Sequence, residues 1–175
     1  MKNMKIISPP VLVLFAIIFV LTFGCNKNSS SSFISSTTPT KEQIKNSSFV
    51  KFINELKNLP DEKRLTELQR FINGNPNSPI IDDHGLACFY WYGKAYSVLI
   101  NGDIQNGWAI PDTMNFISCG DSNFFYKIYS LPADARIDYQ LIVDHSIITD
   151  PRNPIITPSG FGEHSQCAMP MFKSK

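Results

Sequence analysis

The sequence has little excess charge of either sign. Its 16 Lys and Arg nearly balance its 15 Asp and Glu, which leaves a formal net charge of +1 over 175 residues. Lys2 and Lys5 at the N-terminus supply two of the positive charges, so the remainder is close to neutral. Nucleic-acid-binding surfaces concentrate Lys and Arg in a patch or stripe. The balanced composition therefore argues against nucleic acid as a partner.

Metal-binding residues are also scarce. The chain has four Cys and three His, and no C-x-x-C or mixed Cys/His spacing typical of zinc sites. We therefore expect no metal and no cofactor. Outside the cytoplasm one disulfide among Cys88, Cys119 and Cys167 is possible, with one thiol left free, and the sequence does not identify the pair. The alternative is that Cys88 and Cys119 are simply buried as small apolar residues, and we favour it.

The N-terminus has the layout of an export signal. A short positive segment precedes an apolar run that ends at Gly24, and Cys25 follows as in a bacterial lipobox. We expect residues 1–24 to be a lipoprotein signal peptide and Cys25 to be lipidated, with the lipid bilayer as partner. The protein would then be an exported, membrane-anchored lipoprotein. The alternatives are a plain signal peptide and an uncleaved anchor, although the apolar run is barely long enough to span a bilayer.

The next residues limit the size of the folded part. Residues 25–40 are rich in Ser and Thr, which predicts a flexible tether. About 135 residues remain, enough for one small domain but not for a large α/β hydrolase.

Residues 41–75 predict a helical leader. Thr40 and Gln43 have the spacing of a capping box, and apolar residues then recur at helical spacing as far as Leu56. Pro60 predicts the start of a second helix, which we expect to end at Gly74.

The period of the apolar residues changes from 3.6 to 2 after residue 86, which predicts β-strands. The predicted strands are Leu86–Tyr92, Ala95–Asn101, Thr113–Ile117, Asn123–Ser130 and Arg136–Val143. Gly93-Lys94 predicts a tight turn between the first two. Short strands separated by turns indicate an antiparallel β-sandwich over residues 80–172. Four prolines from Pro151 onward predict an irregular segment along the domain, within which Asp150–Pro154 would form a turn closed by Asp and Asn side chains.

Several segments carry a resemblance to a known family. They read ACFYWYGKAYSVLINGDIQNGW, RIDYQLIVD, DPRNP and GFGEHSQCAMP. The stretch from His84 to Met169 resembles the N-terminal early-set, immunoglobulin-like domain of bacterial enterochelin-esterase-like enzymes, where it precedes an α/β-hydrolase domain. The resemblance implies a mainly β fold, an immunoglobulin-like early-set sandwich behind a two-helix leader.

Early-set domains are also similar to glycogen-binding modules, and that likeness implies a ligand site. The Trp that stacks on sugar in those modules matches Trp108, and a second ligand position falls at Gln140. A second stacking Trp matches Ile147, which offers no aromatic ring. Together with Asp103 and Asn106, Trp108 and Gln140 are the candidate ligand-binding residues for a glycan or a siderophore-type molecule. Trp108 covering the edge of the sandwich is the structural alternative.

Catalysis by the full family requires a Ser nucleophile in G-x-S-x-G, and this chain has none. His84, His145 and His164 each lie beside acidic residues, but neighbours in sequence rarely give catalytic geometry. We expect a non-catalytic, membrane-tethered accessory or binding module that packs against an α/β-hydrolase domain or holds a ligand. The alternative is a fragment of an esterase whose catalytic domain is missing or separately encoded.

Overall fold

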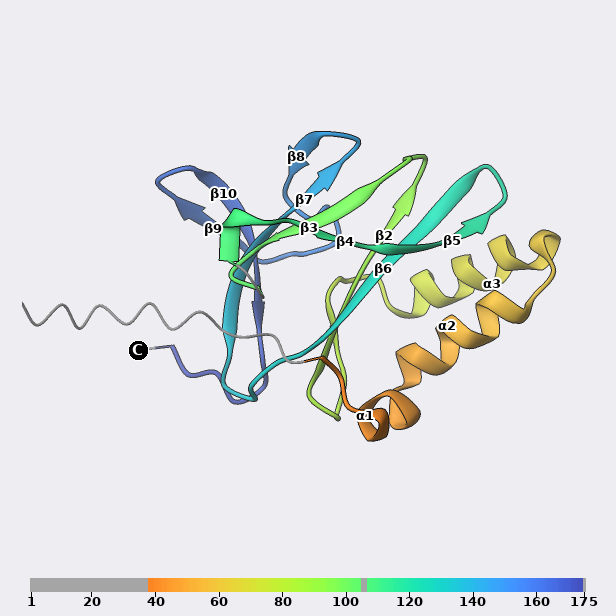
Figure 1. Ribbon diagram of the computed structural model, residues 1–175, viewed down its shortest axis with the longest axis horizontal. Coiled ribbons are helices and arrows are strands. Elements are labelled where there is room, and N and C mark those ends of the chain that lie inside the picture. Colours follow the sequence, from red (N-terminus) through yellow and green to blue (C-terminus); the bar gives the residue numbers. More distant parts are fainter. Residues whose placement is uncertain (1–37, 105–106, 175) are drawn as a thin grey trace, which may run out of the picture. The chain divides into compact units, whose positions relative to one another are not determined.

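The computed structural model describes residues 38–104 and 107–174. The predicted signal segment, Cys25 and most of the predicted tether lie outside the described residues. Within the described residues the protein is mainly β, with two antiparallel sheets and helices packed on one of them (Figure 1). None of the described helices is long and apolar enough to cross a bilayer.

The helices follow the predicted leader, with one extra break. They are α1 (Lys41–Asn46), α2 (Ser48–Asn58) and α3 (Asp61–Gly74). The capping box at Thr40 is confirmed, because the Thr40 side chain accepts from the Gln43 amide and the Gln43 side chain accepts from the Thr40 amide. The helix is interrupted at Ser47. The extended backbone of Ser47 ends α1, and its hydroxyl caps α2 by accepting from the Val50 amide.

The first sheet lies between the helices and the second sheet. Its order is β1 (Ile80–Ile81), β2 (Leu86–Gly93), β6 (Ser122–Ser130) and β5 (Asn115–Cys119). Side chains alternate along β2, so that Cys88 and Tyr90 pack in the cluster with α2 and α3, while Ala87 and Phe89 pack in the cluster shared with the other sheet. This sheet is therefore covered on both faces.

The second sheet has one face in the core. Its order is β4 (Asp112–Thr113), β3 (Val98–Gly102), β7 (Arg136–Val143), β10 (Gly162–Ala168) and β9 (Ile156–Ser159), and β8 (Ser146–Ile148) pairs with β7. The predicted alternation of β7 is confirmed, because Ile137, Tyr139 and Leu141 are buried and face the first sheet. The residues between them, Asp138, Gln140 and Ile142, lie on the outer face.

The predicted tight turn at Gly93-Lys94 is wrong. β2 pairs with β6, whereas β3 pairs with β7 in the other sheet, so the segment between β2 and β3 crosses from one sheet to the other. A distant side chain satisfies the backbone of this crossing, since Asp144 Oδ1 accepts from the Tyr96 and Ser97 amides, both at 2.9 Å. These long-range hydrogen bonds replace those that a hairpin would have made.

The expectation of an irregular C-terminal segment is also wrong. β9 and β10 form an antiparallel hairpin, and β10 pairs with β7. Pro158 lies in β9, which is an edge strand where a missing amide costs no ladder hydrogen bond, and β10 contains no proline. The turn at Asp150–Pro154 is confirmed, since Asp150 Oδ1 accepts from the Arg152 amide and Asn153 Oδ1 from the Ile155 amide.

Candidate binding site around Trp108

The site begins at a close contact between β3 and β7. Gly102 ends β3, and a Cβ atom built on it would lie 2.3 Å from the Asp138 carbonyl oxygen. Directly after it, the Asp103 amide donates to the Asp138 carbonyl at 2.9 Å, and Asp103 Oδ2 accepts from the Asp138 amide at 3.1 Å. Glycine at position 102 therefore lets Asp103 lie against β7 with its carboxylate fixed.

Replacing Gly102 with alanine is expected to lower the free energy of unfolding by about 2 kcal/mol, because the added methyl group has no space beside β7. Urea denaturation would measure the change. Gly74→Ala is the matched control, since nothing lies within 4 Å of a Cβ built there. Equal stabilities of the two variants would contradict the close contact.

The other carboxylate oxygen of Asp103 fixes Trp108. The indole Nε1–H donates to Asp103 Oδ1 at 2.8 Å, and Trp108 lies in the short 3₁₀ turn η1 (Gly107–Ala109). Its ring lies over the imidazole of His164 on β10, with centroids 4.5 Å apart and planes inclined by 31°. Trp108 is 36% exposed while His164 is 9% exposed, so the histidine supports an indole that remains accessible to solvent.

Gln140 lies on the same outer face of this sheet. Its neighbours along β7, Tyr139 and Leu141, point into the core, and its own Nε2 donates to the Glu163 carbonyl on β10 at 3.0 Å. The amide oxygen of Gln140 is the acceptor left for a ligand. Asn106 lies outside the described residues. Ile147, on β8, is 64% exposed and presents only an aliphatic surface.

Ser159 and His164 make a contact that the sequence did not predict. Ser159 Oγ lies 3.4 Å from His164 Nε2, but the hydroxyl donates to the Gly162 carbonyl at 2.8 Å and accepts from the Phe161 amide at 3.1 Å. The serine thus closes the β9–β10 turn and its proton is directed away from the imidazole. Ser165 is fully buried and accepts from the Asp150 amide at 2.8 Å.

The other polar clusters are turn structures. Asp82 Oδ1 accepts from the amides of His84 and Leu86, both at 3.0 Å. His145 lies with positive φ in the turn between β7 and β8. In the described ranges, no group of three His, Cys, Asp or Glu is placed to hold a metal ion.

The three described cysteines, Cys88, Cys119 and Cys167, are buried free thiols. Burial raises the pKa of Cys167 to about 12 and raises the pKa of Cys88 and Cys119 as well. At neutral pH all three are protonated and act as small apolar side chains. No disulfide joins these three cysteines in this structure, and the expectation of simple burial is confirmed for Cys88 and Cys119.

Comparison with known proteins gives distant and partial likenesses. No family model and no curated protein matches the chain. Among solved structures, enterochelin esterase from Shigella flexneri is 18% identical, with a TM-score of 0.40 over 50% of this chain and 30% of that one. Ferric enterobactin esterase from Salmonella typhimurium is 16% identical, with a TM-score of 0.47 over 61% of this chain and 37% of that one. The chain thus spans about a third of the length of these esterases.

The structure brings together Asp103 and Trp108 by a hydrogen bond and places Gln140 on the same face. His164 was not predicted as part of this site, because its sequence neighbours gave only a polar pattern. The available sign was the period of 2 near the end of Gly162–Ala168: Ser165 and Cys167 are buried on the inner face, which places His164 on the outer face. The structure also shows a separate pocket around Arg152 that the sequence did not indicate.

Proposed function

We propose that the chain is a non-catalytic binding module, held at a membrane through Cys25, that binds a glycan on the outer face of the β3–β7–β10 sheet. The observation that supports this most directly is the exposed indole of Trp108, fixed by Asp103 below its N–H and by His164 below its ring. A flat aromatic surface held in one orientation stacks on the C–H face of a sugar ring at little entropic cost.

Polar contacts around the indole would orient the sugar. The Gln140 amide is held to Glu163 through its nitrogen, so its oxygen is positioned to accept from a sugar hydroxyl. Asn106 would add a second amide. Binding would remain weak, because Ile147 supplies no second aromatic ring to sandwich or extend the contact. The module would position a glycan, or a catalytic partner near one, without making or breaking a bond.

Calorimetric titration of the full chain with a linear and a cyclic glucan tests this proposal, in a detergent without a sugar headgroup. We expect saturable binding with a Kd of about 1 mM or lower, corresponding to about −4 kcal/mol. Trp108→Ala should weaken binding at least about tenfold, a loss of about 1.4 kcal/mol. Phe116→Ala, which removes an exposed aromatic ring from the other sheet, should leave binding unchanged.

The chain contains two Trp, at positions 91 and 108, so Trp91→Phe leaves Trp108 as a single fluorophore. Its emission should shift as glucan is added. No saturable binding to either glucan, or equal affinity in wild type and Trp108→Ala, would refute glycan binding at this face.

A further inference from the structure

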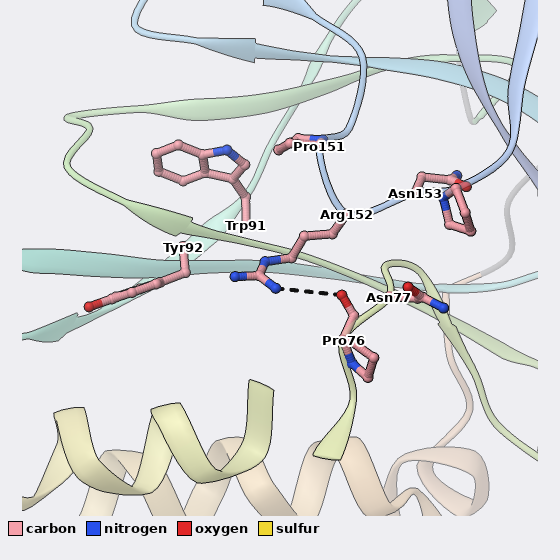
Figure 2. A pocket seen from close by; sticks show the side chains of 8 residues that line it. Pro76, Asn77, Trp91, Tyr92, Pro151, Arg152 and Asn153 are labelled. Carbon is pink, nitrogen blue, oxygen red and sulfur yellow. Dashed lines mark hydrogen bonds between the residues drawn. The ribbon is translucent and has the colours of Figure 1, made fainter. Parts of the chain in front are cut away.

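A second site lies at the edge of the first sheet. An open pocket of about 440 Å³ is lined by the chain after α3, the end of β2 and the turn at residues 151–154. Figure 2 shows the side chains of Trp91, Tyr92 and Arg152 around this space, with Pro76 and Pro151 at its margins. The volume is within the range of pockets that hold small molecules, about 300–1,000 Å³. Trp108 and Gln140 are not among its lining residues.

Arg152 forms no ion pair in the described part of the chain, since no carboxylate oxygen there lies within 4.0 Å of its guanidinium. Its charge does act on the buried Asp150, where it offsets part of the rise in the pKa of that carboxyl. The Arg152 Nη1 makes a long contact of 3.5 Å with the Pro76 carbonyl (Figure 2). Its guanidinium lies 5.7 Å from the Tyr90 ring centroid. These contacts hold the guanidinium at the pocket, and a side-chain hydrogen bond to Tyr90 uses a further donor, so that part of its five N–H donors remains for a ligand.

The carboxylate two residues before Arg152 makes its hydrogen bonds elsewhere. Asp150 is buried, and its oxygens accept from the Tyr139 hydroxyl at 2.8 Å and from the Arg152 amide at 2.9 Å. Both bonds tie Asp150 to the interior and to the backbone of the turn. They also fix the backbone of Arg152, so that its side chain begins from a rigid position.

Trp91 and Tyr92 form the aromatic walls of the pocket, at the end of β2 where this edge of the strand has no described partner. β1 pairs with β2 at Ala87 and Cys88, and beyond them no described strand pairs with that edge. Trp91 and Tyr92 are consecutive strand residues, so they leave the edge on opposite faces. The Trp91 ring folds over Gly93, where a Cβ would be 2.5 Å from its Cη2, and packs against Phe125 at 5.8 Å. The indole is therefore fixed.

We propose that this pocket binds a small molecule that carries a carboxylate beside a flat ring. A guanidinium pairs with a carboxylate through two parallel N–H···O bonds, which a neutral group of the same shape cannot reproduce. Trp91 and Tyr92 offer ring surfaces for the flat part of the ligand. The site uses residues separate from those of the Trp108 face, so it stands whether or not that face binds glycans.

Benzoate and benzamide form the test pair, because they share ring and shape but differ in charge. Isothermal titration of the full chain should show saturable binding of benzoate, with benzamide at least about tenfold weaker. Arg152→Gln should weaken benzoate binding at least about tenfold, since it removes a charge-assisted pair. Arg70→Gln is the matched control, an exposed arginine on α3 paired with Glu67, and should leave benzoate binding unchanged.

A Trp108→Phe variant leaves Trp91 as the single fluorophore, and its emission should change with benzoate. Arg152→Lys keeps the positive charge, so it separates the effect of losing the charge from the effect of losing the fold. Circular dichroism and the melting temperature would also report any loss of folding. Equal affinity for benzoate and benzamide would overturn the proposal. The same conclusion would follow from unchanged benzoate binding in a folded Arg152→Gln variant, or from no saturable binding to wild type. Failure of glucan binding alone would leave this proposal intact.

Discussion

Replacing Phe89 with alanine is expected to lower the free energy of unfolding by about 3–5 kcal/mol. Phe89 is fully buried on the face of β2 that contacts the second sheet. Its ring lies edge-on to Tyr139 on β7, with centroids 4.9 Å apart, and to Tyr129 on β6 at 5.7 Å. Removing the ring would leave a cavity between the two sheets and would also break both aromatic pairs.

Chemical denaturation followed by circular dichroism would measure this loss. Phe161→Ala is the matched control, because Phe161 is 97% exposed at the β9–β10 turn. Its removal should change stability by no more than about 0.5 kcal/mol. A loss below about 1 kcal/mol in Phe89→Ala would mean that the two sheets do not pack through this residue.

Replacing Asp150 with alanine is expected to cost about 3 kcal/mol. The Asp150 carboxylate accepts from the Tyr139 hydroxyl and the Arg152 amide, and both donors would remain buried or partly buried without it. Leaving a buried donor unpaired costs about 1–3 kcal/mol. The Asn153 side chain still donates to the Tyr139 oxygen at 3.0 Å, but it cannot accept the Tyr139 proton through its nitrogen. Asp150→Asn retains an acceptor oxygen and should lose less.

A comparison of wild type with Asp150→Asn also tests the protonation of Asp150. Burial raises the pKa of this carboxyl, although the hydrogen bonds that it accepts offset part of the effect. The folded protein therefore holds this proton to a higher pH than the unfolded chain does. The stabilising contribution is fully present below the unfolded pKa of about 3.9 and is lost as the pH rises to the raised value.

Asp150→Asn has no titrating group at this position, so it provides the reference. The stability of wild type relative to Asp150→Asn should decrease as the pH rises from about 3.9 through the raised pKa, and should then stay constant. Urea denaturation at a series of pH values would measure the difference. A relative stability that increases over this range would show that the pKa is lowered in the folded protein.

Local chemistry made several features predictable from the sequence. The capping box at Thr40 depends on residues three apart, and the buried face of β7 depends on an alternation of period 2. The Asp150–Pro154 turn is likewise closed by side chains that bond amides two residues on. In each case the interacting groups are neighbours along the chain, so their spacing is visible before folding.

The candidate site was predictable only in part. Asp103 and Trp108 are five residues apart, and their hydrogen bond follows from a local loop. The support of Trp108 by His164 joins residues 56 positions apart through the pairing of β7 with β10. The local pattern around His164 indicates only the face on which it lies, and the contact with Trp108 depends on which strands become neighbours.

The sequence by itself determined the mainly β character, the helical leader and the inward and outward faces of the strands. The tertiary structure decided that β2 and β3 belong to different sheets, that residues 156–168 form a hairpin, and that Arg152 meets Trp91 and Tyr92 at one pocket. The apolar periodicity of a strand indicates which of its faces is buried, but it carries no information about the partner strand. Partner choice depends on burial and hydrogen bonds between distant segments, and these exist only once the chain has folded.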